Sequence, residues 1–391
     1  MERVLITGGS HSEVPLIKAL HRLGYEVIST GKDDGGLGHQ LADHYEKGDY
    51  SDWEYVLGLA QKWDVCGIVS GCNDFAYLST AYACAMLGLP GHDAPVIAGK
   101  LHHKNEFRKQ CRQLGIQTPA FYTIESTAQL RELEHELQYP VIVKPTDLTG
   151  GKGVRKCDNF YEVEMAYQAA VVMTRAKEIL IEEYVEGSNH GVSALLKNGK
   201  VCFAFFDNEE YYKNKYLVVG AYAPSDLTEE MKDGICRDIE KLAGSWKLKD
   251  GLFHCQCILK DHKNVYFIDP CRRSPGDLYL LLVEYATGCR YAENIVRAEL
   301  GLEYDIQVAE VSRRIARECL MPDRNGVYQD LFIPKEYEER IVDKVLWGQK
   351  GFMIDDYLKY KVGILFLEFD SVEEEKRMLR ELRDKIRLRM A

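Results

Sequence analysis

A strand-like segment that ends in a lysine and runs into a glycine-rich loop is the strongest chemical signal in the sequence. Residues 140–143 are mostly apolar and β-branched, and they lead directly to Lys144. Glycines let backbone N–H groups approach phosphate oxygens without a side-chain clash, and a lysine at a strand end adds a fixed positive charge. Together these features suit a triphosphate. The loop residues are Gly150, Gly151, Lys152 and Gly153.

Further candidate residues lie on both sides of this loop. Lys104 precedes it and offers a second cation. After it, the apolar strand-like segment 179–181 runs into Glu182, Glu183 and, two residues on, Val185. A carboxylate and open main-chain groups at a strand end can bind the amino edge of adenine, although an isolated pair of glutamates is usually a solvated charge pair.

A third group of candidates lies on a predicted hairpin. Residues 253–257 and 265–269 are strand-like, and the turn-rich segment 261–264 separates them. If the hairpin is antiparallel, Gln256 and Asp269 lie opposite each other and offer oxygen ligands for Mg²⁺. Arg273, just beyond, would stabilise negative charge on a phosphoryl group in transfer.

The elements that must position these residues begin with an alternation of short apolar strands and amphipathic helices. This pattern predicts a doubly wound parallel sheet. The turn at residues 7–12 has glycines and a serine N-cap but lacks GxGxxG spacing, so a plain strand-to-helix turn is at least as good an interpretation as a dinucleotide site. The expected strands are 4–6, 25–28 and 66–69, and the expected helices are 12–23, 51–63 and 74–87.

The rest of the chain has a different pattern. A basic amphipathic helix is expected over residues 99–114, and residues 140–270 have the strands and turns of an α+β unit. The last segment predicts strands near 341–347 and 361–368 and a charged helix near 371–388. We therefore expect three domains, at residues 1–98, 99–302 and 303–391, with a lid at about 120–188 in the second.

Composition narrows the class of protein. The 391 residues carry a net charge of -11, which argues against nucleic-acid binding because phosphate neutralisation needs clustered cations. The sequence has no apolar run long enough for a membrane helix and no signal-peptide pattern, and its twelve cysteines lack framework spacing, so we expect a cytoplasmic protein. Cys255 and Cys257 form a close pair, which we interpret as buried packing rather than a metal site.

The order and spacing of these motifs resemble the ATP-grasp superfamily, in particular its carboxylate–amine ligase, biotin carboxylase-like and carbamoyl phosphate synthetase-like branches. The resemblance covers about residues 1–300 and, more loosely, the tail. It implies an α/β and α+β fold, with an N-terminal doubly wound sheet, an ATP-grasp fold with a mobile lid, and a small C-terminal segment. It also implies that Lys104 and Lys144 bind nucleotide, that residues 149–154 form the phosphate lid, and that Glu182, Glu183 and Val185 contact adenine.

The sequence departs from the superfamily pattern at the metal site. The superfamily usually has glutamate at the positions of Gln256 and Asp269 and asparagine at that of Cys271, and it often has a ribose-contacting glutamate near Asn189. Fewer hard oxygen donors should weaken Mg²⁺ binding. A non-catalytic ATP-binding protein is therefore one alternative, although both lysines, the glycine loop, Asp269 and Arg273 favour a working enzyme.

The reaction implied by the resemblance has two steps. A small carboxylate attacks the γ-phosphate of ATP to give an acyl phosphate and ADP, and an amine then displaces phosphate. The implied cofactors are ATP and Mg²⁺, with Mn²⁺ as a substitute, and Lys144 and Arg273 are the expected catalytic residues. A bicarbonate-using carboxylase of the purine-synthesis or biotin carboxylase type is a second alternative.

The expected partners are a small-molecule carboxylate and an amine, without nucleic acid or membrane, and a homodimer is conceivable because related enzymes are often dimers. The amine site is expected between the first domain and the central sheet. Its weak candidates, each equally able to serve as a cap or turn residue, are Gly8, Gly9, His11, Asn73 and Asp74.

Overall fold

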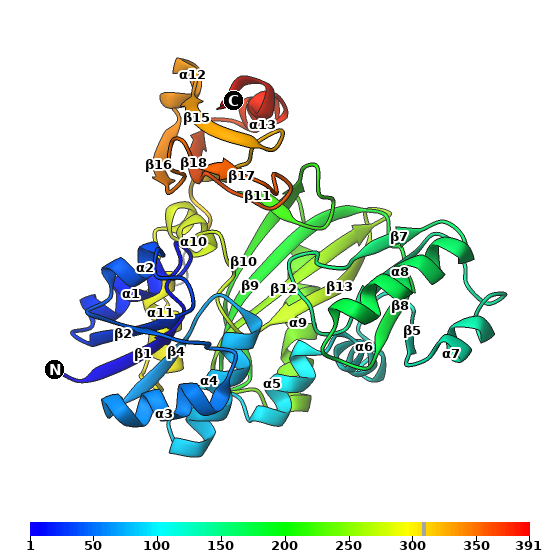
Figure 1. Cartoon of the computed structure of the whole chain (residues 1–391), viewed down its shortest axis with the longest axis horizontal. Coiled ribbons are helices and arrows are strands. Elements are labelled where there is room, and N and C mark those ends of the chain that lie inside the picture. Colours follow the sequence, from blue (N-terminus) through cyan, green and yellow to red (C-terminus); the bar gives the residue numbers. More distant parts are fainter. Residues whose placement is uncertain (307–309) are drawn as a thin grey trace. The chain divides into compact units, whose positions relative to one another are not determined.

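The computed structural model describes residues 1–306 and 310–391, which form two compact units. Unit 1 contains residues 1–91, 205–226 and 274–391, and unit 2 contains residues 92–204 and 227–273. Strand β10 (Lys200–Tyr211) begins in unit 2 and ends in unit 1. Figure 1 shows the elements of both units. Within the described residues, no helix is both long and apolar enough to span a membrane.

Unit 1 begins with a parallel sheet whose strands lie in the order β3-β2-β1-β4. On one face, α3 and α4 pack against Leu5, Ile28 and Ile68, while α1 contacts β2 and helix α11 (Tyr291–Glu299) contacts both α1 and β4. This sheet confirms the doubly wound N-terminal fold. Its elements are β1 (Arg3–Thr7), α1 (Val14–Arg22), β2 (Glu26–Gly31), α2 (Leu37–Leu41), β3 (His44–Lys47), α3 (Trp53–Trp63), β4 (Gly67–Ser70) and α4 (Asp74–Leu87).

Unit 2 contains a small antiparallel sheet in the order β5-β8-β6-β7, which carries the glycine-rich loop. The apolar side chains of β6 and β8 pack with those of α7 and α8 to form its core. Because β6 and β7 are hydrogen-bonded neighbours, they fix both ends of residues 146–154. The elements are β5 (Phe121–Ile124), α7 (Thr127–Glu132), β6 (Val141–Pro145), β7 (Arg155–Cys157), α8 (Phe160–Met173) and β8 (Ile179–Glu183).

A second sheet in unit 2 has the order β13-β12-β9-β10. Its β12–β13 pair is the antiparallel hairpin predicted from the sequence. The strands are β9 (Ser188–Lys197), β12 (Gly251–Lys260) and β13 (Asn264–Cys271), and the unit's remaining helices are α5 (Pro95–His102), α6 (Lys104–Gln113) and α9 (Glu229–Trp246).

In unit 1 the strand order from β10 onward is β10-β11-β14-β18-β16, and a smaller sheet has the order β17-β15-β19. Helix α13 packs its apolar residues against β14 and β18. The elements are β11 (Val218–Ala223), α10 (Tyr279–Thr287), β14 (Arg314–Leu320), β15 (Gly326–Phe332), α12 (Lys335–Glu338), β16 (Ile341–Leu346), β17 (Met353–Ile354), β18 (Gly363–Phe369), α13 (Val372–Lys385) and β19 (Arg387–Met390).

Three local expectations were wrong in detail. The predicted helix 99–114 is two helices, because the backbone is extended at His103 between α5 and α6. The predicted C-terminal helix ends at Lys385, and the residues after it form β19. Ser12 does not cap α1; Glu13 occupies the N-cap position without a side-chain cap.

Candidate active site

Strand β6 holds Lys144 in a buried position. Residues 141–145 are all buried, and only 4% of Lys144 is exposed to solvent. The Lys144 ammonium group lies 2.7 Å from Glu182 Oε1 and 3.7 Å from Asp269 Oδ1. Because β6 and β8 are antiparallel neighbours, with Ile142 opposite Glu182, the fold places this lysine and this glutamate together.

Both carboxylate oxygens of Glu182 contact a buried cation. Its Oε1 atom forms an ion pair with Lys144, and its Oε2 atom lies 3.1 Å from both Nε and Nη2 of the fully buried Arg108. Burial alone would raise the pKa of Glu182, but Lys144 and Arg108 outweigh it and lower the pKa. The glutamate is therefore ionised, and it neutralises part of the charge of two buried cations.

Lys104 joins this group from the first residue of α6. Its Nζ donates to the main-chain oxygen of Leu148 at 2.6 Å and lies 3.9 Å from Asp269 Oδ2. Its backbone N–H donates to the carbonyl oxygen of Thr146 at 3.1 Å. Both contacts tie the start of α6 to the base of the glycine-rich loop, so the lysine predicted upstream and the loop predicted downstream meet.

Asp269 on β13 completes the charged cluster of Lys104, Arg108, Lys144, Glu182 and Asp269. Burial opposes ionisation of Asp269, but Lys104, Lys144 and Arg108 together lower its pKa to about 2. Three cations and two carboxylates leave one net positive charge on the cluster. A site with this excess favours an anion such as a polyphosphate.

The glycine-rich loop has the backbone that its sequence predicts. Gly150, Gly151 and Gly153 all have left-handed φ angles, of +65°, +71° and +73°. At Gly153 a Cβ atom would also lie 2.9 Å from Pro145 Cγ, so both conformation and space require glycine there. Lys152 is exposed at the loop's surface. The loop's main-chain amides can therefore approach an anion, and Lys152 can add a mobile charge.

The adenine candidates lie where β8 ends. The Glu183 N–H donates to the Ala120 carbonyl at 2.8 Å, and its carboxylate pairs with Lys260 at 3.0 Å. Val185 is buried. Since Glu182 is fully engaged with Lys144 and Arg108, the roles of Glu182, Glu183 and Val185 toward adenine remain predictions.

The two metal candidates lie at an irregularity in the hairpin. Cys255 pairs with Pro270 and Cys257 with Phe267, so the register shifts at Gln256, and Ile268 and Asp269 both lie across from it on β13. Asp269 Oδ1 is buried without a hydrogen-bond partner among the described residues, and such an acceptor suits a cation. Residues 1–306 and 310–391 contain no group of three or more His, Cys, Asp or Glu side chains arranged to hold a metal ion.

The adjacent arginines at the end of β13 have different environments. Arg272 is 5% exposed; it pairs with Asp93 at 2.8 Å and donates to the carbonyl oxygens of Lys249, Gly251 and Leu252. Arg273 is only half-buried. Arg273 is a candidate from the sequence motif alone. The contacts of Arg272 show that this neighbouring arginine stabilises the fold.

The cysteines near this site pack in the core. Cys255, Cys257 and Cys271 are all buried, and burial raises the pKa of the Cys255 thiol well above its usual range. A thiol that stays protonated is a poor metal ligand. These observations agree with the interpretation of Cys255 and Cys257 as packing residues.

Sequence reasoning missed Arg108, the buried partner of Glu182. A signal was present, because Lys104 and Arg108 are four residues apart and share one face of a helix. The helix was predicted as basic and amphipathic, but nothing in its own pattern showed that this face would be buried.

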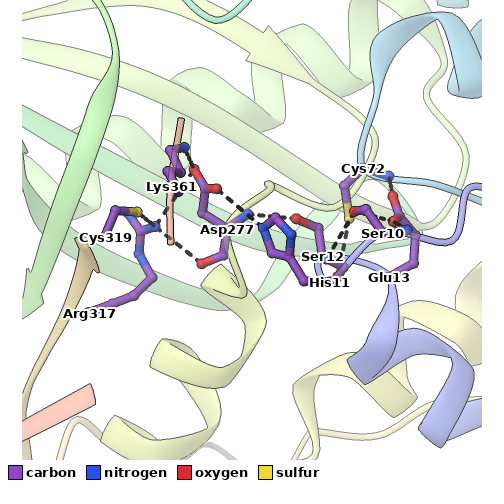
Figure 2. Close-up of polar contacts among 9 residues, drawn as sticks. All are labelled: Ser10, His11, Ser12, Glu13, Cys72, Asp277, Arg317, Cys319 and Lys361. Carbon is purple, nitrogen blue, oxygen red and sulfur yellow. Dashed lines mark hydrogen bonds and ion pairs between the residues drawn. The ribbon is translucent and has the colours of Figure 1, made fainter. Parts of the chain in front are cut away.

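The weak amine-site candidates of unit 1 divide into structural residues and one open case. Asn73 caps α4 by accepting the Phe75 N–H, and Gly8 and Gly9 leave room for Glu13 and His39. Asp74 is buried in the first turn of α4. His11 is different, because it stacks on Trp347 and faces Asp277, whose side-chain contacts Figure 2 shows.

Residues 137–278 match the family model of the ATP-grasp domain. The chain is 20% identical over 355 residues to a formate-dependent phosphoribosylglycinamide formyltransferase of Wolinella succinogenes, covering 89% of this chain and 88% of that protein. Its fold is similar to that of an L-amino acid ligase from Bacillus licheniformis, with a TM-score of 0.83, 20% identity and coverage of 100% and 98% of the two chains. It is also similar to the biotin carboxylase domain dimer of Hydrogenobacter thermophilus 2-oxoglutarate carboxylase, in complex with MgADP, ADP and bicarbonate, with a TM-score of 0.81, 18% identity and coverage of 100% and 91%.

These matches confirm the predicted resemblance to the ATP-grasp superfamily and the predicted fold class. The protein is an ATP-dependent ligase, the enzyme class predicted from the motifs. The superfamily uses ATP and a divalent metal ion and acts on small molecules.

Proposed function

We propose that this enzyme uses Mg-ATP to convert a small carboxylate to an acyl phosphate and then joins the acyl group to an amine. The observation that carries the proposal is the charged cluster of unit 2, in which Lys104, Lys144 and Arg108 exceed Glu182 and Asp269 by one positive charge beside a glycine-rich loop. A buried, preorganised excess of positive charge stabilises phosphate oxygens without reorganisation during the reaction.

In the first step a carboxylate oxygen of the substrate attacks the γ-phosphorus, and the bond to the ADP oxygen breaks. Lys104, Lys144 and the amides of residues 149–153 hold the phosphates, and Arg273 stabilises charge on the phosphoryl group in transfer. Glu182 keeps Lys144 in place at 2.7 Å. This work is positioning and electrostatics rather than covalent chemistry by the protein.

Asp269 and the side-chain oxygen of Gln256 would hold the Mg²⁺ ion. Mg²⁺ commonly uses one or two protein oxygens and completes its shell with water and substrate phosphates. Among the described residues Asp269 Oδ1 is buried and accepts no hydrogen bond, which fits this arrangement, and the neutral Gln256 contributes no charge. When bound, the ion would neutralise the β- and γ-phosphates. Mn²⁺ would serve as a substitute.

Bicarbonate is the second candidate for the activated acid. It is supported by the similar fold of the biotin carboxylase domain solved with MgADP and bicarbonate. A bicarbonate-dependent reaction would use the same cluster and the same first step, and only the acid would differ.

Three broader features are part of the proposal. The enzyme has three domains, at residues 1–98, 99–302 and 303–391, with a lid at about 120–188 that excludes water from the acyl phosphate. It is a homodimer, as the biotin carboxylase domain of similar fold is. It is cytoplasmic, which the sequence supports, because its twelve cysteines lack the spacing of the disulfide frameworks that are typical of oxidising compartments.

The test is ADP release from Mg-ATP with three separate pools: amino acids, other small carboxylates including formate, and bicarbonate. Lys144→Ala should lose at least about 10²-fold of the activity, because it removes a preorganised charge beside the phosphates. Lys109→Ala is the matched control, since Lys109 is exposed and pairs with Glu106 on its own helix. If no pool stimulates ADP release although ATP still binds, the chain is the non-catalytic ATP-binding protein instead.

A further inference from the structure

Arg108 is a fully buried cation of unit 2 whose only part in the proposed reaction is its charge. Burying a guanidinium is costly unless acceptors match its donors well. Arg108 lies on α6, and its side chain contacts two strands that are far apart in the sequence, β8 and β13. All three elements belong to unit 2. We therefore asked what a cation held between these two strands can do.

The contact with β8 fixes the carboxylate of Glu182. Arg108 Nε donates to Glu182 Oε2 at 3.1 Å, and Nη2 lies 3.1 Å from the same oxygen. The other oxygen, Oε1, lies 2.7 Å from Lys144 Nζ, whereas Asp269 Oδ1 lies 3.7 Å from the same Nζ. Glu182 and Asp269 thus share one ammonium group, and the position that Arg108 gives to Glu182 leaves Asp269 with the weaker contact.

The contact with β13 fixes the main chain next to Asp269. Ile268 and Asp269 both lie across from Gln256, so β13 has a β-bulge at this point. A bulge disrupts the ladder locally and redirects a side chain, and bulges are frequent beside active sites. The carbonyl oxygen of Ile268 accepts from Arg108 Nη1 at 2.5 Å. The guanidinium therefore holds the bulge from which Asp269 projects.

Strand β13 needs this support because it is an edge strand of its sheet. Outside the ladder with β12, the Phe267 N–H donates to the Gln117 carbonyl oxygen at 2.9 Å, and the Phe267 carbonyl oxygen accepts from Thr118 Oγ1 at 2.9 Å. These two bonds fix the residue before the bulge, whereas Arg108 fixes the bulge itself. The contact with Arg108 is therefore the one that bears directly on the direction of Asp269.

We propose that Arg108 is the positioning residue that keeps Asp269 available to the metal ion. It holds Glu182 against Lys144, and it holds the bulge that directs Asp269. A guanidinium suits this task because its donors form a rigid, planar fork, so one side chain fixes a carboxylate and a carbonyl relative to each other. The inference rests on the proposed function, because it assumes that Asp269 binds the metal of Mg-ATP.

The role of Arg108 determines what happens when its contacts are weakened. If Glu182 shifts, Lys144 can move toward Asp269 and form a closer ion pair with it. A divalent ion then has to displace an ammonium group before it can bind to Asp269. As long as the positive charge of the cluster is kept, the phosphates are still attracted. Metal binding should therefore suffer more than nucleotide binding.

The experiment measures how strongly Mg²⁺ increases the affinity of the protein for a nucleotide. Titration calorimetry gives the Kd of a non-hydrolysable ATP analogue, adenylyl imidodiphosphate, first with EDTA and then with saturating Mg²⁺. The ratio of the two Kd values is the Mg²⁺ enhancement. Binding of Mg²⁺ to the analogue in solution is the same for every variant, so it cancels when enhancements are compared. No acid or amine is needed, so the result does not depend on turnover.

Arg108→Lys keeps the charge but replaces the planar fork by a single ammonium group, which cannot hold both Glu182 and Ile268 in the same geometry. We expect the Kd in EDTA to stay within about threefold of wild type and the Mg²⁺ enhancement to fall by about tenfold, a usual size for coupling between two sites. Arg108→Gln removes the charge as well, so the affinity in EDTA should also fall.

Arg272→Lys is the matched control, because Arg272 is another buried arginine of unit 2. It also joins a carboxylate to main-chain carbonyls: it pairs with Asp93 at 2.8 Å and donates to carbonyl oxygens of β12. Its partners include neither the nucleotide lysines nor the proposed metal ligands. Arg272→Lys should lower the unfolding midpoint, as Arg108→Lys should, but keep the full Mg²⁺ enhancement. Scanning calorimetry without nucleotide measures the midpoints.

Each outcome decides one of the two proposals. A reduced Mg²⁺ enhancement in Arg108→Lys, with full enhancement in Arg272→Lys, supports the positioning role. Unchanged enhancement in Arg108→Lys, or equal reduction in both variants, shows that Arg108 only stabilises the fold and overturns the inference. If Arg108→Lys does not fold, Arg108→Gln, which leaves two lysines and two carboxylates in the cluster, gives the same comparison. If the analogue does not bind to the wild type, the proposed function has failed, and that failure does not depend on Arg108.

Discussion

The substitution Glu182→Gln tests most directly how the charged cluster of unit 2 works. Glutamine has nearly the same shape as glutamate but lacks its charge. Glu182 is 4% exposed, and its carboxylate lies 2.7 Å from Lys144 and 3.1 Å from Arg108. The substitution therefore leaves two buried cations with Asp269 as their remaining carboxylate. Removing one partner of a buried ion pair typically costs about 3–5 kcal/mol.

This cost should appear as a lower unfolding temperature. For a domain of 150–250 residues, each kcal/mol shifts the midpoint by about 2–4 °C, so the expected decrease is roughly 6–20 °C. The control is Glu183→Gln, one residue further along the same strand. Glu183 is about one-third exposed and pairs with Lys260 at the surface, so the loss should stay below about 1 kcal/mol.

ATP adds a second, independent readout. Because a triphosphate can neutralise the cations that Glu182→Gln leaves unpaired, ATP should raise the unfolding midpoint more in this variant than in wild type. Calorimetry of wild type and both variants, with and without Mg-ATP, measures all of these values. Equal and small effects of the two substitutions would refute the view that Glu182 balances the buried cations, and so would an ATP effect that is smaller in Glu182→Gln.

Four further results are expected. Burial raises the pKa of Glu318 to about 8, so folding takes up a proton at this carboxylate near neutral pH. The free energy of unfolding of the wild type should therefore fall as the pH rises from about 4.5 to 8. Denaturant titrations at several pH values measure this dependence, and Glu318→Gln should flatten it. Arg272→Lys should lower the unfolding midpoint, because a lysine cannot match four contacts of a buried guanidinium, whereas Arg273→Ala should lower ADP formation by roughly 10²-fold with little change in the midpoint. A Cβ atom at position 150 would meet no atom within 4 Å, so Gly150→Ala costs only the strain of its φ of +65°, about 1 kcal/mol. The KM for ATP should rise, and the free energy of unfolding should change by no more than this strain. A divalent-metal chelator should abolish ADP formation but leave the midpoint of the nucleotide-free protein unchanged, as no group of three His, Cys, Asp or Glu ligands lies in the described ranges 1–306 and 310–391.

The features that the sequence predicted best are those encoded locally. The alternation of buried strands and amphipathic helices predicted the parallel sheet, and helix α4 lies at the predicted residues 74–87. The glycines of the loop were predicted from their conformational freedom, and their left-handed φ angles confirm that reason. Lys104, Lys144 and Asp269 were named separately from motif order, and the structure brings each lysine within 4 Å of Asp269.

The features that the sequence did not predict depend on contacts between distant segments. Arg108 is paired with Glu182, 74 residues away, and an arginine in a basic helix carries no mark of such a partner. Helix α11 completes the packing of the first sheet from residues 291–299, so the doubly wound layer was predicted without one of its helices. Local periodicity shows which face of an element is apolar, but it does not show which element covers that face.

His11 illustrates the same limit. In the sequence it was one of five weak candidates in or near turns, with nothing to separate it from Asn73, which proved to be a helix cap. What distinguishes it are Asp277, 266 residues later, and Trp347, later still, and neither lies in a motif that predicts a partner for residue 11. A phosphate-binding loop is recognisable from sequence because its chemistry is carried by neighbouring residues. The contacts of His11 with Asp277 and Trp347 are assembled from separate parts of the chain, so they become visible only in the folded unit.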